Sequence, residues 1–223
     1  MSQRVESWKN ALLNAARTHG QKRAAVVPVK TYPGSEAMAA LVRRIFFPSN
    51  GLRRTRLLFA AAGRETGISV LCEQAARVLN SISGGSVAMV DACLSAQERK
   101  PSQSAGGAQQ WLCHSTRITE QVWRMSPWAL NETGPPLPMV WPSVTGHELP
   151  FDYILYAATV SASEMPLFCR MCDGAVLVLT ANRTRREAAL RAKEYLLQCG
   201  ATLLGTVLEG RLFPVPEAIY WRL

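Results

Sequence analysis

A short loop between an apolar strand and a helix holds the residues of this chain that could bind phosphate. Residues 57–60 are apolar, and Gly63, Gly67 and Ser69 follow within the loop and the start of the helix. Loops of this kind hold phosphate with backbone N–H groups, a lysine on the outer phosphates and a serine or threonine hydroxyl on Mg²⁺. Residues 31–99 contain no lysine, so no shift of register supplies one. The loop predicts a phosphate site without its cationic side chain.

The pattern around the loop predicts apolar strands that alternate with helices. The strands are predicted at 57–60, 87–91, 151–157, 173–180 and 202–208, and the helices at 35–47, 68–82 and 185–199. Thr184 and Glu187 have the spacing of a capping box, in which the threonine oxygen caps the first turn of the helix. This alternation indicates βαβ units, and therefore an α/β fold with a mostly parallel sheet and helices on both faces.

The length and composition suit one α/β domain with an extension. The chain has 223 residues, of which 48% are hydrophobic. We interpret residues 35–223 as the domain and 1–34 as a basic N-terminal extension that ends in a linker. Within the domain, residues 111–150 are rich in Trp and Pro, and we interpret them as an irregular, insert-like region.

The positive charge of the chain belongs to its N-terminal part. Residues 1–56 hold eleven lysines and arginines against two acids, whereas 57–223 hold fourteen of each sign. Residues 3–18 have the pattern of an amphipathic helix, which fits either docking on the protein's own core or a role at an anionic membrane or partner protein. Its apolar positions are Val5, Trp8, Leu12 and Ala15. The aromatic interleaving of single-strand nucleic-acid binders is lacking, so nucleic acid is disfavoured as a partner.

The remaining composition favours a cytoplasmic protein without a metal. No apolar run approaches the ~20 residues of a membrane span, and the first residues lack the apolar core of a signal peptide. The six cysteines are scattered, and Cys169 and Cys172 form a lone CxxC without a second ligand pair. Reduced thiols in the core are therefore favoured over a metal or redox site.

The strands, the loop and several short motifs resemble the cytoplasmic P-loop domain of the bacterial tyrosine autokinases of capsular and exopolysaccharide synthesis. These kinases belong with the ATPases of the deviant-Walker type. The similarity covers about 35–100 and 150–223, and 111–150 matches poorly. The segments that carry it most strongly are FDYILYAATV, CDGAVLVLTANRTRREAALRAKEYL and LLGTVLEGRLFPVPEAIYWRL. The resemblance implies a P-loop NTPase-like fold and, in active members, ATP and Mg²⁺ as cofactors.

The loop departs from the family pattern, which reads like PGEGKST. Aligned on Ser69, Gly67 stands in the place of the lysine that stabilises charge on the transferred phosphate. If Gly67 is instead the glycine before that lysine, Ile68 stands in its place. Arg64 is the nearby cation, but it does not hold the expected position.

The acidic positions of the family also differ. Asp91 keeps the first acid of the Asp-x-Asp motif, but Cys93 replaces the second. Ala157 stands where the third motif has a carboxylate for the Mg²⁺ shell, and Glu209 replaces the asparagine that reads the adenine. Since Mg²⁺ needs oxygen ligands, the resemblance implies a site that has lost much of its metal binding.

Two further family features are altered. Glu36 of the subunit-packing motif Glu-x-x-Arg-x-x-Arg is kept, but Ala39 and Val42 hold its arginine positions, with Arg43 and Arg44 just beyond. Glu36, Arg43 and Arg44 are the candidate residues of an oligomer interface. The C-terminal tyrosine cluster, which is the family's usual autophosphorylation target, is missing.

These departures predict a catalytically degenerate protein with no catalytic residue, no cofactor and no metal. It would act as a regulatory or scaffolding subunit in exopolysaccharide synthesis or secretion, with an inner-membrane chain-length component as partner. Residues 1–30 could hold it peripherally at an anionic membrane surface. One alternative is a weakly active ATPase or tyrosine kinase that uses ATP and Mg²⁺, and a weaker one is an unrelated binding role with the basic arm on nucleic acid. The degenerate nucleotide-site candidates are Gly63, Arg64, Glu65, Thr66, Gly67, Ser69, Asp91, Glu209 and Pro216.

Overall fold

The computed structural model describes residues 35–49, 51–63, 67–93, 115–125 and 151–210. The predicted N-terminal extension lies outside these residues. The described helices are α2 (Ser35–Phe46), α3 (Ile68–Ser83), α5 (Met165–Met171) and α6 (Arg186–Gln198). The described strands are β1 (Arg56–Ala61), β2 (Val87–Asp91), β3 (Ser115–Thr119), β4 (Val122–Met125), β5 (Tyr153–Thr159), β6 (Gly174–Thr180) and β7 (Leu203–Glu209).

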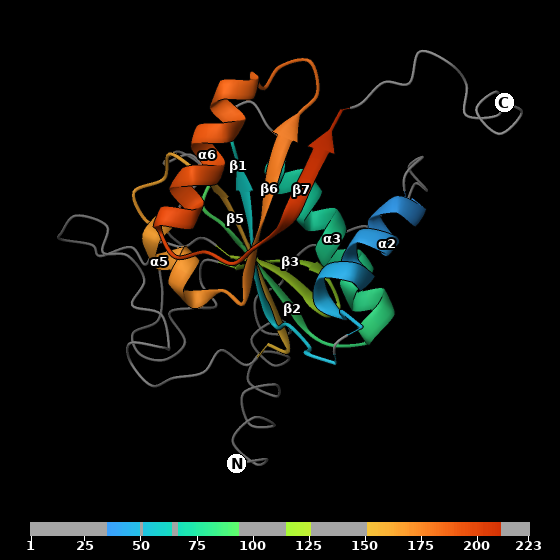
Figure 1. The fold of residues 1–223 in the computed structure, drawn as a ribbon. Helices are drawn as coiled ribbons and strands as arrows, with labels where there is room; N and C mark the ends of the chain where they lie inside the picture. The colour runs from blue at the N-terminus through green and yellow to red at the C-terminus, as the bar shows by residue number, and fades with distance from the viewer. Residues whose placement is uncertain (1–34, 50, 64–66, 94–114, 126–150, 211–223) are drawn as a thin grey trace, which may run out of the picture.

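The strands form one sheet in the order β3-β4-β2-β5-β1-β6-β7. Every neighbouring pair is parallel except β3 and β4, which pair antiparallel at one edge. Helices α2 and α3 lie on one side of the sheet, and α5 and α6 lie on the other (Figure 1). The mostly parallel α/β architecture that the alternating pattern predicted is therefore confirmed.

Both faces of the central strands β1, β2, β5 and β6 are buried, which explains why these strands are almost continuously apolar. Along β1, Leu57 and Phe59 contribute to the core beneath α2 and α3, whereas Leu58 and Ala60 contribute to the core beneath α5 and α6. This is the two-residue alternation of an extended strand. The central strands are thus held by apolar layers on each side, and their ends stay in fixed register.

One of the two predicted helix-end signals is present in the structure, and the other is not. Gly84 follows α3 with φ +66°, and its N–H donates to the carbonyl of Asn80 at 2.8 Å, which is a left-handed glycine stop. The predicted capping box at α6 is wrong. The Thr184 hydroxyl accepts a hydrogen bond from the N–H of Thr180 at 2.9 Å, and the N-cap is Arg185 without a side-chain bond.

Residues 111–150 contain regular structure that the sequence did not predict. Strands β3 and β4 form a hairpin in this segment, and β4 pairs in parallel with β2 so that Arg124 lies opposite Met89. The short helix α5 was not predicted either. Among the described helices, none is long and apolar enough to cross a membrane.

We expect the Leu79→Ala substitution in α3 to destabilise the protein by about 2–5 kcal/mol, because it opens a cavity at a fully buried site. Leu197→Ala is the matched control, since Leu197 is 48% exposed on α6 and its truncation removes little packing. Urea unfolding measures both free energies. Equal losses for the two variants would contradict the packing described for α3.

Candidate functional site

The candidate site lies where the carboxyl ends of the central strands meet the start of α3. The loop after β1 leads into α3, β2 ends at Asp91, and Ala157 of β5 lies beside Asp91 in the sheet register. Strand β7 ends at Glu209 in the same parallel sheet. Open α/β sheets bind ligands at this edge, because loops and helix N-termini gather there.

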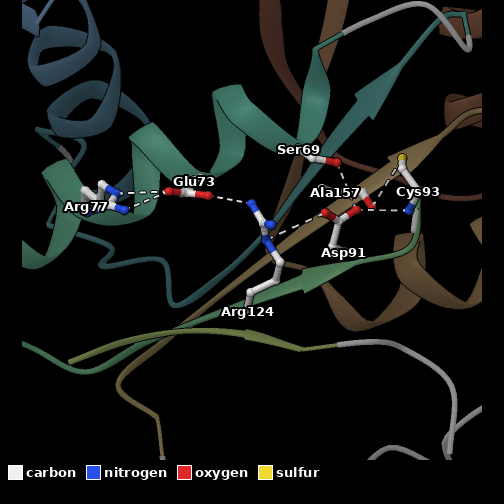
Figure 2. A network of polar contacts seen from close by, with 7 residues as sticks. All are labelled: Ser69, Glu73, Arg77, Asp91, Cys93, Arg124 and Ala157. Atoms are coloured by element: carbon white, nitrogen blue, oxygen red, sulfur yellow. Dashed lines mark hydrogen bonds and ion pairs between the residues drawn. The ribbon is translucent and has the colours of Figure 1, made fainter. Parts of the chain in front are cut away.

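Asp91 is a fully buried carboxylate that residues of this chain engage directly. Its Oδ1 accepts a hydrogen bond from the Ser69 hydroxyl at 2.9 Å and another from the Cys93 backbone N–H at 3.0 Å. Figure 2 shows this carboxylate between α3 and the end of β2. The structure therefore brings together Ser69 and Asp91, two of the residues that the sequence placed at a nucleotide site.

An arginine that no sequence pattern singled out also lies beside Asp91. Arg124 of β4 lies with its Nε 3.9 Å from Asp91 Oδ2, and its Nη2 donates to a carboxylate oxygen of Glu73 on α3. Glu73 also pairs with Arg77 at 2.8 Å one helical turn further along (Figure 2). Carboxylates and guanidinium groups thus alternate along the network. The detectable signal was a cation within the otherwise apolar VWRM segment.

The cysteine in place of the second acid remains a neutral thiol at neutral pH. Burial, followed by the negative charge of Asp91, raises the pKa of Cys93 to about 11. Its Sγ lies 3.9 Å from the carbonyl oxygen of Ala157. A thiol in this state provides neither a carboxylate oxygen nor a thiolate for a metal ion.

Among the described side chains beside Asp91, neither the Cys93 thiol nor the Ala157 methyl group offers the oxygen that Mg²⁺ prefers. This ion needs near-octahedral oxygen ligands, and proteins usually bind it through one or two carboxylates together with substrate phosphates. Asp91 is already bonded to Ser69 and Cys93 and faces the Arg124 guanidinium, while Ala157 contributes a buried methyl group. Within the described ranges, no group of three or more His, Cys, Asp or Glu side chains could hold a metal ion.

A lysine would meet different surroundings in the two registers of the loop. A Cβ atom on Gly67, the N-cap of α3, would lie 2.7 Å from Oε1 of Glu209. Ile68 is 2% exposed and packs in the core beneath α3. A lysine at Gly67 would meet only the flexible end of the Glu209 side chain, which can move aside, whereas a lysine at Ile68 would have to leave the core. Gly63 is exposed, and the other loop and C-terminal candidates lie outside the described residues, namely Arg64, Glu65, Thr66 and Pro216.

The three interface candidates are exposed on α2. Glu36 lies in its first turn, and Arg43 and Arg44 lie in its last turn. Their exposure is what an intersubunit contact would require. The interface itself stays a prediction.

No protein-family model matches the chain. Over 63 residues it is 29% identical to the tyrosine-protein kinase YwqD of Bacillus subtilis (strain 168), and this match spans 27% of each of the two proteins. The kinase domain of the Escherichia coli tyrosine kinase ETK is similar in structure, with a TM-score of 0.59 and 13% identity over 81% of this chain and 78% of that one.

Two further solved structures have the same fold. The chimerical protein CapA2B2 has a TM-score of 0.55 and 19% identity, over 81% of this chain and 86% of that one. The BceF tyrosine kinase domain has a TM-score of 0.54 and 17% identity, over 78% of this chain and 76% of that one.

The sheet and its helices have a P-loop NTPase-like α/β fold, as the solved kinase domain does. Among proteins with this fold, the comparisons support the resemblance to the bacterial tyrosine kinases that the motifs indicated. The fold prediction is confirmed.

We expect Arg124→Met to lower the free energy of unfolding by about 1–3 kcal/mol, because it removes the guanidinium that faces the buried Asp91. Arg77→Met is the control, since Arg77 lies at the outer, more exposed end of the network and its helix pair contributes about 0.5 kcal/mol. Chemical denaturation compares the variants. A loss at Arg124 no larger than that at Arg77 would show that Asp91 does not depend on this guanidinium.

Proposed function

We propose that this chain is a catalytically degenerate relative of the bacterial tyrosine autokinases, which acts as a regulatory or scaffolding subunit in exopolysaccharide synthesis or secretion. The main observation in support is the state of Asp91. This carboxylate, at the position where the family organises Mg²⁺, faces the Arg124 guanidinium of the same chain and has Cys93 and Ala157 beside it in place of acids.

The other residues of the pocket support the same proposal. Three separate changes lie around one edge of the sheet. They are the missing lysine at Gly67, the thiol of Cys93 and the methyl group of Ala157. Removing one electrostatic stabiliser from an active site commonly lowers the rate by about 10²–10³. Several such losses at one phosphoryl-transfer site would leave little catalysis, since that chemistry depends on positioning and charge.

The intact core favours a retained role over decay of the whole protein. Both apolar layers are filled, and strands β1, β2 and β5 at the candidate site are almost entirely buried. Selection for a folded surface, without selection for phosphate chemistry, would preserve this combination. The surfaces around the pocket are then the functional part of the molecule.

The partner is proposed by analogy with the family rather than from the site. An inner-membrane chain-length or secretion component of the polysaccharide system is the expected partner. The basic segment 1–30 would add electrostatic attraction to the anionic cytoplasmic leaflet. The second candidate function is a weak ATPase or tyrosine kinase, which Ser69 favours because its hydroxyl remains at the start of α3 beside Asp91.

We expect no Mg²⁺-dependent ATP binding by the natural protein in isothermal titration calorimetry, because the lysine and two carboxylates are missing. A Gly67→Lys/Ala157→Asp variant restores one cation and one carboxylate. In the same titration we expect it to bind Mg-ATP with higher affinity than the natural chain does. The E. coli ETK kinase domain serves as the control for the assay. Micromolar binding together with turnover by the natural protein would refute the proposal in favour of the weak enzyme.

We expect the full chain to sediment with vesicles that contain phosphatidylglycerol and to dissociate as the salt concentration rises, because salt screens its excess of basic residues. Deletion of residues 1–30 should abolish this binding. Arg185→Gln/Arg186→Gln is the control, since it removes two exposed charges at the start of α6. Equal binding to uncharged phosphatidylcholine vesicles, or full binding by the deletion variant, would refute the membrane role.

A further inference from the structure

The N-terminus of α3 attracts negative charge. The first N–H groups of a helix have no partner within the helix, and the aligned peptide dipoles place a partial positive charge there. Such an end after a glycine-containing loop is a ready site for a phosphate. In α3, which has 16 residues, the N-cap is Gly67, no side chain caps it, and its first turn contains no acidic residue.

A carboxylate from another element reaches this end of the helix. Glu209 ends β7, and its Oε1 and Cδ lie 2.7 Å and 3.6 Å from the position that a Cβ atom on Gly67 would occupy. The absence of a side chain on Gly67 is therefore what leaves space for the Glu209 carboxylate. The carboxylate therefore lies beside the N-cap of α3, where the helix end favours negative charge.

The backbone of Glu209 is held in the sheet, which fixes the point from which its side chain extends toward Gly67. Glu209 pairs with Thr180 in the β6–β7 register, and its carbonyl accepts a hydrogen bond from Ala181 at 2.8 Å. Oε2 is buried and has no hydrogen-bond partner within the part of the chain that the structure describes. Burial of a charged oxygen is costly unless other charges compensate it, and the partial positive charge of the α3 N-terminus is of the required sign.

We propose that Glu209 is an internal anion that occupies the place of a phosphate at the N-terminus of α3. The N-terminus of α3 then faces an anion of the chain itself, and a phosphate that approached the same N–H groups would be repelled by the carboxylate. Arg124 plays the complementary part beside Asp91, where it supplies positive charge next to a buried carboxylate. The two charges that Mg²⁺ and a phosphate would bring to this edge are thus already present as side chains.

This proposal rests on the proposed function, because a protein that does not use nucleotide has no need of a free phosphate site. It also gives a specific cause for the loss of phosphate binding. Loss of the lysine alone would weaken phosphate binding, whereas Glu209 opposes it actively. Removal of this one side chain should therefore restore anion binding without any restored lysine.

The test uses Glu209→Gln, which keeps the shape and removes the charge, and Glu209→Ala, which also opens the space beside Gly67. The probe is inorganic pyrophosphate without metal, titrated by calorimetry into the full chain. We expect at least a tenfold gain in affinity over the natural protein for each variant. Glu194→Gln, at an exposed position of α6, is the control and should behave as the natural chain does.

A second measurement keeps the test informative if one variant folds poorly. Without ligand, Glu209→Gln should lower the thermal unfolding midpoint, and the difference from the natural protein should shrink as salt screens the helix end. Glu194→Gln should leave the midpoint unchanged. No gain in pyrophosphate affinity in either Glu209 variant, or an unchanged midpoint in Glu209→Gln, would overturn the inference.

The two proposals can fail separately. Mg-ATP binding and turnover by the natural protein would refute the proposed function, and a gain on removing Glu209 would still support the internal anion. If the natural protein binds no nucleotide and the Glu209 variants gain nothing, the internal anion is refuted while the degenerate function stands.

Discussion

The rest of the site depends on one buried carboxyl group, Asp91, and on the groups that surround it in the interior. A carboxylate in a protein core is tolerated only when hydrogen bonds and opposite charge replace the water that it has lost. Here the Ser69 hydroxyl, the Cys93 N–H and the Arg124 guanidinium do so. Each comes from a different part of the chain, so the same contacts also join α3, the end of β2 and the edge hairpin.

This arrangement explains how a P-loop-like fold can persist after its chemistry has changed. The core needs apolar volume in the right order along strands and helices, and many sequences meet that demand. The pocket needs particular atoms within a few tenths of an ångström, and a single replacement removes them. Ala157 illustrates the difference, because it fills its place in the core as well as its strand neighbours do while it contributes no metal ligand.

The elements beside the loop could be predicted because their signals are local. The apolar run of β1, the helical spacing after Ile68 and the glycines after α3 each lie within a few residues of the structure that they specify. The hairpin β3–β4 and α5 were missed because they are short, and pairing with β2 or packing on the sheet stabilises them more than their own pattern does. The capping box at α6 failed for a related reason, since Thr184 found a partner in the backbone of Thr180.

The sequence by itself determined the class of fold and the residue types around the candidate pocket, because hydrophobic periodicity and motif spacing are properties of neighbouring positions. Only the tertiary structure decided that Arg124 faces Asp91 and that Glu209 lies against Gly67. These pairs are separated by 33 and 142 positions along the chain. No local pattern encodes such contacts, because they arise only when the parallel sheet brings the ends of distant strands to one edge.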